Sequence, residues 1–97
     1  MQIIHDLAQK ALANSYSEAD LMSFRQLTAS TTRLPENATQ ADINALIQVL
    51  KIFMMKKETM DFGSYCLNTF LRFLRHDERV FQAFVPRKEV LKKMLID

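Results

Sequence analysis

The chain has 97 residues, a net charge of +2 and 48% hydrophobic residues, values that predict one folded domain over residues 1–97 and exclude a disordered chain. One glycine and two prolines leave little of the turn chemistry that β-hairpins need, and a single glycine cannot build a phosphate-binding loop. With one cysteine, no secretory signal pattern and no long apolar run, we expect a soluble cytoplasmic protein without a disulfide or a membrane span.

The N-terminal third predicts two helices and a loop. Across residues 2–13, apolar side chains recur at the three- and four-residue spacing of one helical face. Ser17 followed by Asp20 resembles an N-terminal capping box, so a second helix should follow. Residues 28–39 combine hydroxyl and β-branched side chains with a proline, and the second helix should therefore end near Ser30 in a surface loop.

The third predicted helix is the most apolar segment of the chain. Thr39 and Asp42 form a second capping signature in front of it. Apolar residues then continue around more than one helical face as far as Met55. Such a helix is either central in a bundle or shared between the core and a partner.

The remaining sequence predicts two or three further helices. A turn is expected across residues 58–64, because this stretch contains Gly63. A fourth helix then carries an apolar stripe that includes Cys66, Asp77 should cap a short fifth helix, and Pro86 suits the start of a last one. The predicted architecture is all-α, a small antiparallel helical bundle of five short helices, with four to six compatible with the pattern.

The sequence contains no recognisable catalytic or metal-binding constellation. His5 and His76 lie far apart, and Cys66 has no second cysteine at a metal-ligand spacing. Cys66 also falls on the apolar stripe of the fourth helix, where an inert buried thiol is commoner than a reactive one. We therefore predict that the protein is not an enzyme and uses neither a cofactor nor a metal ion.

A surplus of methionine and aromatic residues surrounds the end of the third helix. Flexible methionines beside aromatic rings are typical of adaptable binding surfaces, although they also fill ordinary cores. We predict an apolar partner-binding patch on the third and fourth helices. Its six residues are Ile52, Phe53, Met54, Met55, Met60 and Phe62.

Charge is distributed unevenly along the chain. Residues 1–48 carry three basic and five acidic residues, whereas residues 49–97 carry ten basic and six acidic residues. A basic face could contact an acidic partner or nucleic acid, but the interleaved acidic residues are equally typical of a solvated surface. The candidate contacts are Arg72, Arg75, Arg79, Arg87, Lys88, Lys92 and Lys93.

These patterns favour a small non-enzymatic protein-interaction module, in the manner of an adaptor, inhibitor, immunity protein or chaperone. It would bind another protein, or a second copy of itself, through the apolar patch. The alternative is a nucleic-acid-binding regulator that uses the basic C-terminal half.

Overall fold

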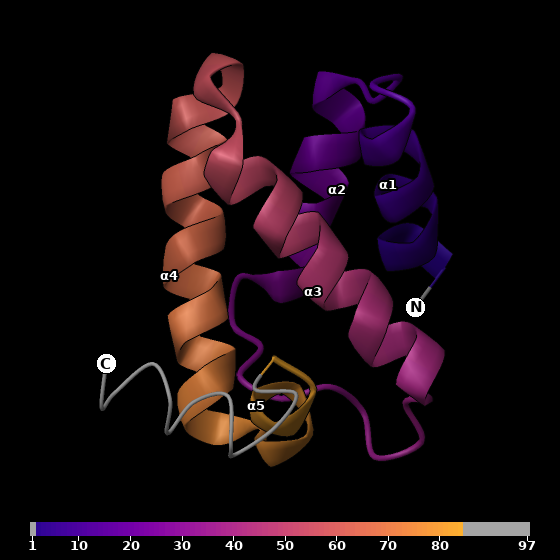
Figure 1. Ribbon diagram of the computed structural model, residues 1–97, viewed down its shortest axis with the longest axis vertical. Coiled ribbons are helices and arrows are strands. Elements are labelled where there is room, and N and C mark those ends of the chain that lie inside the picture. The colour runs from indigo at the N-terminus through magenta and orange to yellow at the C-terminus, as the bar shows by residue number, and fades with distance from the viewer. Residues whose placement is uncertain (1, 85–97) are drawn as a thin grey trace, which may run out of the picture.

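The computed structural model describes residues 2–84, which form five α-helices, one short 3₁₀ helix and no strand (Figure 1). The predicted all-α class is therefore confirmed. The predicted helix that begins at Pro86 lies outside the described residues. The elements are α1 (Gln2–Leu12), α2 (Glu18–Thr28), α3 (Gln40–Met55), η1 (Lys57–Thr59), α4 (Met60–His76) and α5 (Glu78–Phe84).

Helix α3 is the centre of the bundle. It crosses the molecule diagonally, with α1 and α2 on one side and α4 on the other, and it contacts α1, α4 and α5 (Figure 1). Leu46, Val49, Leu50 and Phe53 are completely buried in the single hydrophobic core. The apolar surplus of α3 is thus explained by contacts with several helices, as expected of a central helix.

Both predicted capping boxes are present, and each joins a second helix to α1. The N–H of Asp20 donates to the Ser17 hydroxyl, and the Asp20 carboxylate accepts from the Ser17 N–H and from Lys10 of α1. Asp42 plays the same part at the start of α3, where it also bonds to His5 of α1. Each capping carboxylate therefore fixes the position of α1 as well as a helix end.

The turn predicted across residues 58–64 is wrong. The chain turns earlier, through the 3₁₀ segment Lys57–Thr59, and Gly63 already lies inside α4. A Cβ atom on Gly63 would lie 2.8 Å from the carbonyl oxygen of Phe53, a distance too short for carbon and oxygen. Gly63 therefore permits the close crossing of α3 and α4, and its role is in packing.

Candidate protein-binding groove

The predicted apolar patch is divided between the core and the surface. Phe53 is completely buried and Phe62 is 5% exposed, because both rings lie on the faces of α3 and α4 that close the core, with ring centroids 4.8 Å apart. Met55 and Met60 are 83% and 73% exposed. The predicted apolar patch is therefore corrected: Phe53 and Phe62 belong to the core, and only Met55 and Met60 of its six residues are exposed. Its other two members are half-buried: Ile52 and Met54.

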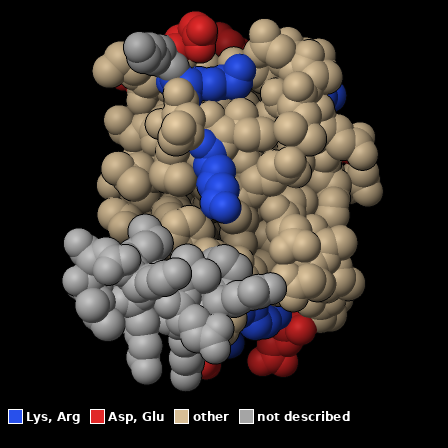
Figure 2. Space-filling model, in the orientation of Figure 1, with Lys and Arg blue, Asp and Glu red and all other residues tan. Residues whose placement is uncertain are grey.

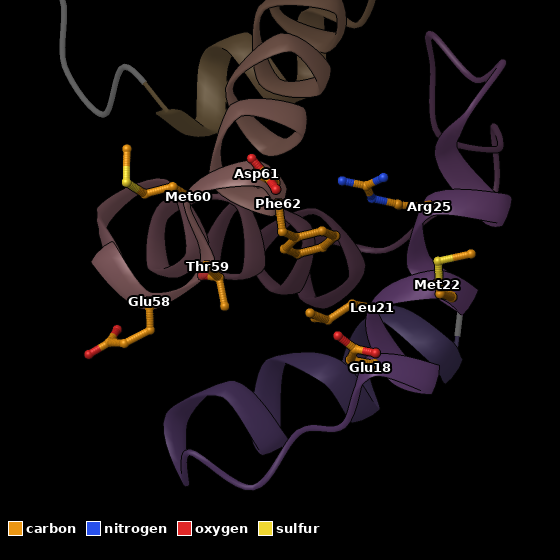
Figure 3. Close-up of a pocket in the computed structure, with 9 residues that line it drawn as sticks. All are labelled: Glu18, Leu21, Met22, Arg25, Glu58, Thr59, Met60, Asp61 and Phe62. Carbon is orange, nitrogen blue, oxygen red and sulfur yellow. The ribbon is translucent and has the colours of Figure 1, made fainter.

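Met60 borders a groove that the sequence does not reveal. The groove lies between α2 and the start of α4 and has a volume of about 560 Å³. Figure 3 shows the Leu21 side chain and the Phe62 ring facing one another between the two helices, and Met22, 54% exposed, lies on the α2 side. The lining residues are Glu18, Leu21, Met22, Arg25, Glu58, Thr59, Met60, Asp61 and Phe62.

Three exposed carboxylates make the groove acidic. They belong to Glu18, Glu58 and Asp61, here called the groove carboxylates, and no basic side chain that the structure describes pairs with any of them. Arg25 is the one basic residue among the described residues of the lining, and its guanidinium lies 5.7 Å from the Phe62 ring centre and 4.9 Å from that of Tyr65. A cation–π contact therefore holds Arg25 against the rings.

Hydrogen bonds between α2 and α4 hold the two walls of the groove together. The Tyr65 hydroxyl donates to the carbonyl oxygen of Arg25 over 3.1 Å. The same hydroxyl lies 2.6 Å from the Thr28 hydroxyl. Thr28 in turn donates to the carbonyl oxygen of Phe24 within α2. Because these groups are buried or half-buried, the groove is built on a fixed frame.

Arg72, Arg75 and Arg79 would share one helical face only if the fourth helix continued past Asp77, and it does not. α4 ends at His76 and α5 starts at Glu78, so Arg79 belongs to a different helix from Arg72 and Arg75. Arg75 is exposed, whereas Arg72 and Arg79 are half-buried. On the face shown in Figure 2, basic side chains appear singly, and acidic ones lie at its upper and lower ends.

Arg72, Asp77 and Arg79 instead form a loop-anchoring cluster that holds residues 29–39. Arg72 donates to the carbonyl oxygens of Thr28 and Thr31 over 2.7 and 3.0 Å. The guanidinium of Arg79 donates to the carbonyl oxygens of three loop residues and to the carboxylate of Asp77. These two guanidinium groups are therefore bound within the fold. The two loop residues that Arg79 contacts most closely are Leu34 and Pro35.

Asp77 is the buried member of the cluster, at 1% exposure, and it caps α5 as predicted. Its carboxylate accepts the Leu34 N–H over 2.8 Å and pairs with Arg79 over 3.1 Å. Burial alone would raise the pKa of Asp77, but these hydrogen bonds outweigh it and hold the pKa below its usual value of 3.8. The carboxylate is therefore charged at neutral pH.

Four of the predicted basic contacts lie outside the described residues: Arg87, Lys88, Lys92 and Lys93. Of the seven basic candidates, the structure places three, and only Arg75 of those three presents a guanidinium that makes no hydrogen bond within residues 2–84.

The lone cysteine lies in the core, as its place on the apolar stripe predicts. Cys66 is completely buried, and burial raises the pKa of its thiol to about 12 despite the charge of Arg25. The thiol is therefore protonated at neutral pH. In residues 2–84, His, Cys, Asp and Glu form no group of three that could hold a metal ion. Nor does that part of the chain contain a helix both long and apolar enough to cross a membrane.

Comparison with protein-family models, with curated proteins and with solved structures finds no match to this chain. The chemistry of the groove therefore carries the functional inference.

Proposed function

We propose that the protein is a small non-enzymatic protein-interaction module whose groove between α2 and α4 binds its partner. The observation that supports this is the exposure of Met22 and Met60 on opposite sides of a concave surface floored by Leu21 and Phe62. A partner's apolar side chain placed there would lose contact with water against Leu21, Phe62 and the two methionines, and buried anchoring residues supply most of the binding energy of an interface. Methionine can also adjust its shape to the partner.

The lining of the groove favours binding over catalysis. The lining residues that the structure describes include no histidine, cysteine or lysine, and the one arginine among them lies against two aromatic rings. The three groove carboxylates come from three different elements and lie at exposed positions. General acid–base catalysis usually depends on a buried or closely paired group whose pKa is tuned to the reaction. An acidic rim around an apolar floor is instead typical of a surface that selects a partner by charge.

Site-directed photocrosslinking in the native host tests this proposal. A photoreactive phenylalanine analogue replaces Met22 or Met60, and a matched sample carries it in place of Gln9, an exposed residue of α1 that does not line the groove. We expect one discrete protein adduct at both groove positions and none at the control. The substitution Met60→Glu should remove the adduct formed at position 22. Equal adducts at all three positions, or no adduct at any, would contradict the proposal.

A further inference from the structure

We infer that a second stripe of α4, here called the seam, pairs two copies of the chain with their α4 helices antiparallel. The seam consists of Ser64, Leu67, Leu71 and Leu74, which are spaced three, four and three residues apart. Side chains at this spacing meet along the contact of a two-helix coiled coil. None of the four lines the groove, so the inference goes beyond the proposed function and does not depend on it.

The seam is apolar surface that the core of the bundle does not use. α4 packs on α3 through a different stripe, which includes Phe62 and Phe73. Leu67 and Leu71 remain 47% and 42% exposed, and Leu74 is half-buried. α4 also lies at one edge of the bundle that residues 2–84 form (Figure 1). Exposed leucines at coiled-coil spacing on such a helix are typical of a surface that pairs with another helix.

The polar residues beside the seam determine which helix fits it. Asp61, Asn68 and Arg75 follow one edge of the seam at intervals of seven residues, and all three are exposed. When a second α4 runs in the opposite direction, Asn68 faces Asn68 of the second copy. Asp61 of each copy then lies beside Arg75 of the other, because the two residues are equally distant from Asn68. The edge of the seam is therefore complementary in charge to itself.

The same orientation brings the seam residues together. Leu67 of each copy faces Leu71 of the other, so four leucines form the centre of the contact. Ser64 of each copy faces Leu74 of the other at the two ends. This pairing is twofold symmetric and closed, so it gives a dimer and not a filament. The seam spans only about 15 Å of helix, and we therefore expect a dimer that dissociates on dilution.

A parallel pair would lack these charge contacts. In parallel helices, the residues along one edge of the seam face the opposite edge of the second copy. On α4 that opposite edge is formed by Gly63 and Phe70, which are buried in the core of their own chain. Asp61 and Arg75 would then have no charged residue of the other seam to face. The antiparallel arrangement is therefore the one that the sequence of α4 favours.

Charge reversal at the two ends of the seam tests both the dimer and its orientation. Asp61→Lys and Arg75→Glu each place like charges beside one another at both ends, and each should weaken self-association about tenfold. The measurement is sedimentation velocity with light scattering over a range of protein concentrations at low salt. An equimolar mixture of the two variants should form a heterodimer about as stable as the wild-type dimer, because both ends then join opposite charges.

Substitutions within the seam test its apolar contact. Ser64→Leu should tighten the dimer about tenfold, because it adds a leucine to each end of the contact. Leu67→Glu should weaken the dimer by about tenfold or more, because it places a carboxylate among the central leucines. The matched control is Leu27→Glu, since Leu27 is a 40% exposed residue of α2 outside both the seam and the groove. It should leave the dimer unchanged.

Circular dichroism checks that each variant is folded. A wild-type chain that stays monomeric at every concentration would overturn the inference, whatever else covers the seam. A dimer that is insensitive to Leu67→Glu would overturn it as well. A dimer that Leu67→Glu weakens, but whose charge variants do not associate when mixed, would rule out the antiparallel pairing.

Discussion

The two ends of α4 use charge in opposite ways. At the His76 end, the loop-anchoring cluster directs two guanidinium groups and a buried carboxylate onto the backbone of residues 29–39. At the Met60 end, the three groove carboxylates have no basic partner within the part of the chain that the structure describes. Charge that is bonded inside a fold contributes to stability, whereas exposed unpaired charge acts mainly on association. Mutations at the His76 end should therefore change the stability of the fold, and mutations at the Met60 end should change binding.

The largest effect on stability is expected from Asp77→Ala. The substitution leaves the Leu34 N–H buried without an acceptor and removes the anion that faces the half-buried Arg79. We expect a loss of about 3 kcal/mol in the free energy of unfolding, measured by urea denaturation. Asp61→Ala, which removes an exposed groove carboxylate, should change it by less than about 0.5 kcal/mol. Equal losses in the two variants would remove the distinction between the ends of α4.

Low pH should destabilise the fold, because it protonates carboxylates whose pKa is lowered in the folded state. Hydrogen bonds from Arg79 and the Leu34 N–H lower the pKa of Asp77 against the effect of burial, and a hydrogen bond with His5 lowers the pKa of Asp42. A depressed pKa means that the stabilisation is complete above the unfolded value, 3.8, and is lost as the pH falls through the folded value.

We therefore expect the urea midpoint to be steady from about pH 6 to about pH 5 and to fall steeply below about pH 4. In Asp77→Asn, the midpoint should start lower and fall less over the same range, because one of the titrating groups is gone. Parallel acid profiles for the wild type and this variant would show that Asp77 does not titrate as described.

A smaller difference in the free energy of unfolding is expected between alanine variants of two arginines of α4, Arg72 and Arg75. Arg72→Ala removes the hydrogen bonds to the carbonyl oxygens of Thr28 and Thr31, so we expect a loss of about 1–2 kcal/mol in urea denaturation. Arg75 is exposed, and Arg75→Ala should cost less than about 0.5 kcal/mol. If the protein instead bound nucleic acid through these residues, Arg75→Ala would weaken that binding and reduce its salt dependence.

Sequence reasoning succeeds where the signal is local. The two capping boxes, the end of α2 and the burial of Cys66 each depend on residues within a few positions of one another, and the structure confirms all of them. The capping prediction at Asp77 also implies a helix break between Arg75 and Arg79. Because of that break, Arg79 belongs to a different helix from Arg72 and Arg75, and the sequence itself therefore argues against a single helical face that carries all three arginines.

The groove could not be predicted in the same way. Its two walls come from α2 and α4, which are distant in sequence, and the position of α4 is set by its close packing on α3, which it crosses. That crossing depends on the contact between Gly63 and the Phe53 carbonyl, and sequence patterns alone favour a turn at this glycine. The same crossing decides that Phe53 and Phe62 are buried while Met60 is exposed. Helix periodicity predicts on which face of a helix a side chain lies, but it does not predict the angle at which two helices cross.

The smallest effect on stability, and the clearest effect on association, is expected from Met60→Glu. Because Met60 is 73% exposed, the substitution buries no charge, and the melting temperature should be nearly unchanged. It should nevertheless weaken binding of the proposed partner, since it removes an apolar contact from the groove. Leu67→Glu is the matched control, because Leu67 is also on α4 and 47% exposed but does not line the groove. Photocrosslinking from position 22 should therefore separate two variants that thermal unfolding does not. Equal loss of the adduct in both would place the contact along the whole outer face of α4.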